Sequence, residues 1–167
     1  MDAFLAVASK REVRRYADRP LPEDAVRRVL DAGRVAGSSR NRQARRFVVL
    51  SDREAVAATV HMPGNVLGAA VVVAIVTGRK GPTGFDAGRA AQNMMLTAWN
   101  EGIGSCPNGI ADPETLASLV GAGEDEQVAI VLTFGHPARP VDPSSHSAEE
   151  WVERADRVAF EQAVEFR

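Results

Sequence analysis

The clearest helical pattern in the chain lies between residues 85 and 102. Its apolar positions recur at helical spacing and form a broad stripe: Ala87, Ala90, Ala91, Met94, Met95, Ala98 and Trp99. Asp86 stands where the first turn of a helix favours an anion, and Gly102 is a residue that often ends one. A helix this apolar predicts a core element, or one shared with a second copy of the chain. Gln92 and Asn93 fall inside the run, where a buried amide needs hydrogen-bond partners.

Continuous apolar runs predict buried strands at residues 47–50, 69–77 and 128–134. The run at 69–77 is rich in β-branched residues, which is typical of a central strand buried on both faces. A shorter strand follows the long helix and leads through Cys106 into a tight loop at Gly109. These runs predict the strands of one sheet.

Amphipathic or capped segments predict further helices at residues 2–9, 20–37, 51–61, 112–121 and 148–154. The residues at 62–65 should break the third of these. No repeat and no change of composition marks a second domain, so residues 1–167 are expected to form one domain. Residues 155–167 alternate apolar and charged positions, and they either extend the last helix or form an arm that grips a dimer partner.

Composition narrows the classes of protein. The 167 residues carry a net charge of -2, which argues against nonspecific nucleic-acid binding. Cys106 is the single cysteine, so no intrachain disulfide can form, which suits a reducing cytoplasm. The N-terminus lacks the cationic and apolar regions of a signal peptide, and the longest apolar run is too short to span a bilayer. A cytoplasmic protein with no membrane contact is expected.

Several kinds of catalytic site lack their residues. The three histidines are scattered, so no metal site is expected. Ser38 and Ser39 do not lie in a Gly-x-Ser-x-Gly elbow, which leaves a hydrolase triad without a nucleophile. Cys106 could be a nucleophile, but a lone cysteine is more often a small buried apolar residue. No side chain is assigned as catalytic, so an enzyme of this sequence would depend on an organic cofactor.

Two segments could bind phosphate. Cations cluster at residues 10–15; such a run is usually a solvated face, but closely spaced cations can also hold a phosphate by charge-assisted hydrogen bonds. The glycine-rich loop at 78–84 joins a strand to the long helix, a context typical of phosphate-binding loops. Its spacing matches neither a P-loop nor a dinucleotide fingerprint. A flexible connector and a phosphate-binding module are both open for this loop.

Four segments, taken in order, form a recognisable set of motifs. The first is residues 10–14, Lys-Arg-Glu-Val-Arg, and the second is the glycine- and serine-led loop at residues 37–47. The third is the long helix running into residues 102–106, Gly-Ile-Gly-Ser-Cys, and the fourth is residues 134–138, Phe-Gly-His-Pro-Ala. Together they resemble the FMN-dependent nitroreductase family over nearly the whole chain. Its pattern for the first segment is Arg-Arg-Ser-x-Arg, and for the second it is Pro-Ser-Ser-x-Asn-x-Gln-Pro-Trp-x-Phe.

The resemblance implies an α+β fold: an α-β-α sandwich with a central, mostly antiparallel sheet flanked by helices. It also implies an intertwined homodimer with two FMN sites at the subunit interface. The implied activity is that of an oxidoreductase that takes hydride from NADH or NADPH onto FMN by a ping-pong scheme. Nitroaromatics, quinones or similar small molecules would then be the electron acceptors.

The resemblance assigns several sets of FMN contacts. The phosphate and the polar edge of the flavin would meet Lys10, Arg11 and Arg14. The ring and the ribityl chain would meet, from the other subunit, Ser38, Ser39 and Asn41. Backbone amides near the reactive flavin nitrogen would come from Pro107, Asn108 and Gly109. The family's late basic residue falls at Ser145 or His146, which makes His146 the candidate at that position.

The sequence also departs from the family pattern. Glu12 replaces a serine and puts a carboxylate where an anion should bind, and Ala44-Arg45 replaces the Pro-Trp that walls the site. The segment from residue 51 to 68 is short, so an open substrate site is expected, with Asn65 as the remnant of a flavin contact there. Glu12 and the missing late basic residue motivate an alternative: a flavin-binding or sequestering dimer with little turnover.

Overall fold

The computed structural model describes residues 2–167, which form two compact units. The larger unit is residues 11–141, and the smaller combines residues 2–10 with residues 142–167. Within residues 2–167, no helix has both the length and the apolar character that crossing a membrane requires.

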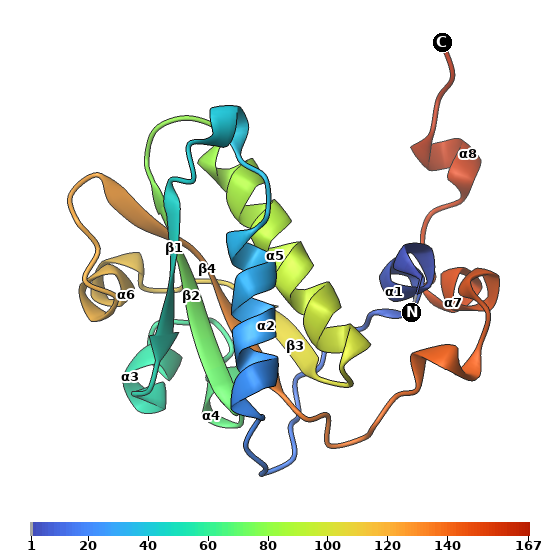
Figure 1. The fold of residues 1–167 in the computed structure, drawn as a ribbon, viewed down its shortest axis with the longest axis horizontal. Helices are drawn as coiled ribbons and strands as arrows, with labels where there is room; N and C mark the ends of the chain where they lie inside the picture. The colour runs from blue at the N-terminus through green and yellow to red at the C-terminus, as the bar shows by residue number, and fades with distance from the viewer. Residues whose placement is uncertain (1) are drawn as a thin grey trace. The chain divides into compact units, whose positions relative to one another are not determined.

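A four-stranded antiparallel sheet forms the centre of the larger unit (Figure 1). Its order is β1 (Arg45–Leu50), β2 (Val71–Gly78), β4 (Glu126–Gly135) and β3 (Gly104–Asn108). Strand β2 lies between two neighbours, and residues 72–77 of it are buried without interruption. The prediction of a central β-branched strand is therefore confirmed.

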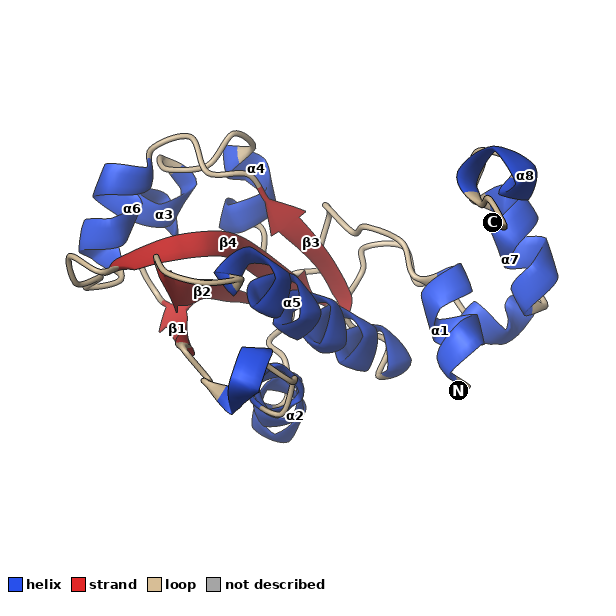
Figure 2. Ribbon diagram, turned by 90° about the horizontal axis from the view of Figure 1, so that it is seen from above, coloured by secondary structure: helices blue, strands red, loops and turns tan. Residues whose placement is uncertain are grey.

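Helices cover both faces of this sheet, as Figure 2 shows from above. Helices α2 (Glu23–Arg34) and α5 (Thr83–Asn100) pack on one face. The other face is covered by the shorter helices α3 (Arg53–Ala57), α4 (Pro63–Leu67) and α6 (Pro113–Leu119). The predicted α+β architecture of a sheet between two helical layers is confirmed.

Helix α5 is the core helix that its apolar stripe predicted. Ala90, Met94 and Ala98 are fully buried against the sheet and α2. Helix α2 approaches closely because Gly33 has no side chain: a Cβ there would lie 2.7 Å from Sδ of Met94. All seven positions of the predicted stripe are buried. Gln92 and Asn93 lie on the exposed side of α5, since α2 and the sheet cover only the opposite side.

Two local predictions were wrong. The helix expected over residues 51–61 ends at Ala57, and the expected break at residues 62–65 is instead the start of α4. Pro63 occupies the first turn of that helix, where a missing N–H costs nothing. Strand β1 was expected to be buried, but it is an edge strand, and Val49 is 53% exposed.

The smaller unit contains α1 (Ala3–Ser9), α7 (Ala148–Arg154) and α8 (Phe160–Ala163). Ser147 and Glu150 form a capping box at the start of α7. Trp151 is buried and donates its indole N–H to the carbonyl of Pro143 at 2.8 Å. Residues 156–167 are exposed along their whole length, and their role as a dimer arm stays a prediction.

Candidate functional site

An extended segment, residues 11–17, is held across one end of the sheet. The N–H of Val13 donates to the carbonyl of Ser105 on strand β3 at 2.9 Å. The N–H of Ala17 donates to the carbonyl of His136, just beyond strand β4, at 2.8 Å. The backbone that carries the predicted phosphate-binding arginines is thus fixed at both of its ends.

Two glycines make room for this segment. Gly104 on β3 and Gly135 on β4 are paired neighbours in the sheet. A Cβ on Gly104 would lie 2.6 Å from Cβ of Val13, and one on Gly135 would lie 2.8 Å from Cδ1 of Tyr16. Because real Cβ contacts are not this short, only glycine lets Val13 and Tyr16 sit directly on the sheet. We call this pair of positions the glycine notch.

A buried hydrogen-bond network lies beside the glycine notch. The hydroxyl of Tyr16 is 3.0 Å from Oγ1 of Thr133, and burial raises the pKa of Tyr16 well above its usual range. The side-chain amide of Asn108 donates to the carbonyl of Cys106 at 3.0 Å and to Oγ1 of Thr133 at 3.3 Å. Asn65 donates in turn to Oδ1 of Asn108 at 3.0 Å. Asn65 is only 6% exposed, so its amide supports Asn108 from within the fold.

Arginines line a groove next to this network. The groove has a volume of about 500 Å³, and its first wall is the segment 11–15. Its second wall is the chain after β4, whose Ala138 N–H donates to the carbonyl of Arg15 at 3.0 Å. Four arginines and one carboxylate line it: Arg11, Glu12, Arg14, Arg15 and Arg139. Its charge is strongly positive, which suits an anionic ligand.

The predicted contacts Ser38, Ser39 and Asn41 lie elsewhere in the larger unit. The N–H of Ser39 donates to the Asp86 carboxylate at 3.1 and 3.3 Å, beside the first turn of α5. The hydroxyl of Ser38 accepts from the N–H of Gln43 at 2.9 Å. Asn41 has a positive φ of 54°, a conformation that asparagine tolerates better than most residues. The loop is thus built around the start of α5.

One chain does not bring these two sets of residues together. The loop at residues 38–43 lies at the end of the sheet where β2 finishes and β4 begins, because Gly78 donates to the carbonyl of Ala44 and pairs with Glu126. The segment 11–17 lies at the other end, where β4 finishes at Gly135 (Figure 1). Strand β4 has ten residues, so the two ends are about 30 Å apart.

The third predicted set of FMN contacts, residues 107–109, lies at the end of strand β3. Pro107 was predicted to offer a backbone amide, but proline has no N–H, so this part of the prediction was wrong. Asn108 pairs with Val131 in the sheet, and the carbonyl of Gly109 accepts from the N–H of His61 at 3.0 Å. The N–H groups of Asn108 and Gly109 are the backbone donors that this set retains.

Lys10 and His146 belong to the smaller unit. Lys10 ends helix α1, with its N–H donating to the carbonyl of Ala6. The ring of His146 meets the ring of Trp151 edge-on, with centroids 5.0 Å apart. Their roles as cofactor contacts stay predictions.

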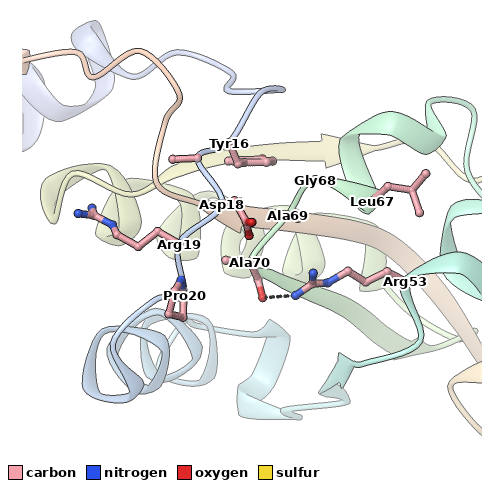
Figure 3. Close-up of a pocket in the computed structure, with 10 residues that line it drawn as sticks. Tyr16, Asp18, Arg19, Pro20, Arg53, Leu67, Gly68, Ala69 and Ala70 are labelled. Atoms are coloured by element: carbon pink, nitrogen blue, oxygen red, sulfur yellow. Dashed lines mark hydrogen bonds between the residues drawn. The ribbon is translucent and has the colours of Figure 1, made fainter.

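Sequence reasoning missed Arg139 as a groove residue, and it included Arg15 only as part of the cationic run at residues 10–15. Arg139 follows the Phe-Gly-His-Pro motif by two positions, and that proximity was the available signal. A second hollow, of about 420 Å³, was also missed (Figure 3). It lies between residues 16–20 and residues 67–70, and Arg53 reaches into it to donate to the carbonyl of Ala70 at 2.9 Å.

Comparison with known proteins identifies the family. Residues 7–70 and 64–136 match the model of the nitroreductase family. A protein of Methanothermobacter thermautotrophicus, provisionally named NADH dehydrogenase/NAD(P)H nitroreductase, is 28% identical and covers 90% of this chain and 88% of its own length. The chain therefore belongs to the nitroreductase family.

Solved structures show the same fold. A nitroreductase family protein of Clostridium difficile 630 superimposes with a TM-score of 0.83 at 20% identity, over 99% of this chain and 98% of its own. A provisionally named nitroreductase of Desulfovibrio desulfuricans, crystallised in complex with FMN, has a TM-score of 0.79 at 26% identity. That likeness covers 100% of this chain and 98% of the other. The nitroreductase fold expected from the sequence is confirmed.

Proposed function

We propose that this chain is an FMN-dependent oxidoreductase that takes electrons from NADH or NADPH and reduces nitroaromatic, quinone or similar small acceptors. Family membership supports the class of enzyme, and the name of the Methanothermobacter relative and the FMN complex of the Desulfovibrio structure support the donor and the cofactor. The observation that carries the proposal is the arginine-bearing segment, held rigidly across the glycine notch beside strand β3.

The chemistry of the groove fits the phosphate of FMN. A phosphate dianion needs several donors, and guanidinium groups bind it with strong, charge-assisted hydrogen bonds. Arg11 and Arg14 would hold it. Glu12 is the single carboxylate that lines the groove, against four arginines. The net positive charge is therefore retained despite the departure from the family pattern.

The backbone at the end of β3 would serve the flavin ring. When bound, FMN supplies the hydride chemistry, accepting from the nicotinamide and delivering to the acceptor. The N–H groups of Asn108 and Gly109 would stabilise negative charge on the ring, because fixed donors in a dry site cost little reorganisation. The Asn65 amide would keep the side chain of Asn108 in place. No side chain is assigned as a catalytic acid.

The proposal includes a homodimer. Ser38, Ser39 and Asn41 lie about 30 Å from the groove along the sheet of the same chain, a length set by ten residues of β4. They can meet the same flavin only if a second copy supplies them. The FMN site is therefore proposed to lie between two chains.

Absorbance spectroscopy tests the proposal directly. Purified protein supplied with FMN should retain a yellow chromophore after gel filtration, elute as a dimer, lose its visible band with NADH or NADPH without oxygen, and regain it with a quinone. Protein that never retains FMN would overturn the proposal.

Glu12 in the groove favours a second candidate function, a flavin-binding protein with little turnover. Retained FMN that neither nicotinamide reduces would support that candidate instead.

A further inference from the structure

The groove beside the glycine notch has a cation on each wall. Arg14 and Arg15 come from the first wall, and Arg139 comes from the chain after β4. Two backbone hydrogen bonds tie the walls together: Ala17 to His136 at 2.8 Å and Ala138 to Arg15 at 3.0 Å. Arg139 directly follows a residue that is bonded to the first wall, so its backbone has a fixed position in the groove.

These three arginines have no internal partners. Among residues 2–167, the side chains of Arg14, Arg15 and Arg139 form no ion pair or hydrogen bond. Several other guanidinium groups of the larger unit are bonded to carboxylates or carbonyl oxygens, as Arg28 is to Glu101 at 2.6 Å. The groove holds four arginines against one carboxylate, Glu12, so its cations repel one another, and an anion with several acceptor oxygens placed between them relieves that repulsion.

We infer that Arg139 is a phosphate-binding residue of the FMN site and supplies the cation of the second wall. This inference rests on the proposed function, and it gives Arg139 the role that the sequence resemblance places at His146. Arginine suits the role because it stays charged at every working pH and can contact two phosphate oxygens at once. His146 belongs to the smaller unit, where its ring meets Trp151.

Binding of FMN and of riboflavin tests this inference, because the two ligands differ only in the phosphate. The full-length protein, stripped of flavin, is titrated with each ligand while flavin fluorescence is followed. Arg139→Gln should weaken FMN binding about tenfold, the effect of losing one charge-assisted hydrogen bond, and leave riboflavin binding unchanged. Arg139→Lys should retain part of the preference for FMN. Arg27→Gln is the matched control, since Arg27 is an exposed arginine on α2 outside the groove.

The outcomes separate the inference from the proposed function. Wild-type protein that binds neither ligand would overturn the proposed function. Wild-type protein that prefers FMN, together with an Arg139→Gln variant that keeps the whole preference, would overturn the inference alone. Equal weakening of both ligands would also overturn it, because it would indicate a general structural role. His146→Gln should leave the preference for FMN intact. If His146→Gln loses that preference while Arg139→Gln keeps it, the role belongs to His146.

Discussion

Two pairs of arginines, each adjacent in sequence, differ in whether their side chains are bonded to other parts of the chain. Arg45 and Arg46, on strand β1, are bound to other parts of the chain. Arg46 forms two hydrogen bonds to the carboxylate of Glu126, at 2.8 and 3.1 Å, and two more to carbonyls at the end of α6. Nη2 of Arg45 donates to carbonyls at the end of α2, among them that of Ala36. Arg14 and Arg15, by contrast, have no side-chain partner among residues 2–167.

The difference shows that a run of charge indicates function only once its partners are known. Arg45 and Arg46 act as helix C-caps, where cations interact favourably with exposed carbonyls and with the helix dipole. This explains why Arg45 can stand where the family pattern has a tryptophan: its role here is to close α2. Arg14 and Arg15, on the wall of the groove, keep their hydrogen-bond donors for a ligand.

Removing the groove arginines should have the largest effect. The double variant Arg11→Ala/Arg14→Ala is expected to weaken FMN binding by at least about a hundredfold, since each charge-assisted contact is worth about 1.5–3 kcal/mol. Fluorescence titration measures the affinity, and thermal unfolding of the flavin-free protein should show little change. An affinity within threefold of the wild type would contradict the assigned role of these residues.

Substituting a residue of the glycine notch should lower the stability of the fold as well as the affinity for FMN. In Gly104→Ala the new methyl group would lie 2.6 Å from Cβ of Val13, so the segment 11–17 must move. Forcing an atom into such a contact typically costs about 1–3 kcal/mol. Denaturant unfolding should show this loss, and FMN binding should weaken with it.

Gly64→Ala is the matched control for that variant. Gly64 lies in α4, and a Cβ there would meet no atom within 4 Å. Alanine is also the better helix former, so this change should be neutral or slightly stabilising. Equal losses in both variants would refute the idea that the glycine notch matters.

A helix-capping arginine should affect stability alone. Arg45→Met keeps an apolar stem but removes the donors to the α2 carbonyls, while it also removes two buried nitrogens, Nε and Nη1, that have no partner. Because these effects oppose each other, the expected loss is about 1 kcal/mol. Denaturant unfolding measures it, and riboflavin should bind as in the wild type. A fall of more than about 3 kcal/mol in the free energy of unfolding would show that Arg45 contributes more to stability than these contacts imply.

The elements of the fold could be predicted because their signals are local. The apolar stripe of α5 and the β-branched run of β2 define those elements within a few residues of the observed bounds. What the sequence could not supply is how much of each element its neighbours cover. Gln92 and Asn93 were therefore expected inside, and β1 was expected to be buried, although α5 is covered on one side and β1 is an edge.

The site was less accessible to prediction because it is assembled from distant segments. Arg15 and Arg139 become neighbours through backbone pairing of their segments, in which the hydrogen bond from Ala138 to Arg15 joins positions 123 residues apart in sequence. The resemblance drew attention to the segment at residues 10–14, but it could not show that Ser38 and Asn41 lie at the far end of the same sheet. The proposed dimer follows from that separation.

The carboxylate in the groove allows a smaller test. Glu12→Ser removes a negative charge from a wall that is proposed to bind phosphate, so FMN should bind more tightly, by about threefold to tenfold. Riboflavin affinity should stay the same, which separates charge from shape. Weaker FMN binding in this variant would indicate that Glu12 is needed to orient its arginine neighbours.

The smallest expected effect is on stability at low pH, and it concerns the ion pair between Arg46 and Glu126. The guanidinium of Arg46, with help from the N–H of Gly123, lowers the pKa of Glu126 from its ordinary 4.5 to about 2. A carboxyl group with a lowered pKa stabilises the fold fully above its unfolded value and loses that contribution as pH falls through the folded value. The wild type should therefore lose this part of its stability between about pH 4.5 and pH 2.

In Arg46→Met the loss of stability over that pH range should be smaller, as thermal unfolding at successive pH values would show. Arg27→Met, which removes an arginine without a carboxylate partner, should follow the wild-type profile. Parallel profiles for all three proteins would mean that solvent screens the exposed Arg46–Glu126 pair too strongly for it to affect acid stability.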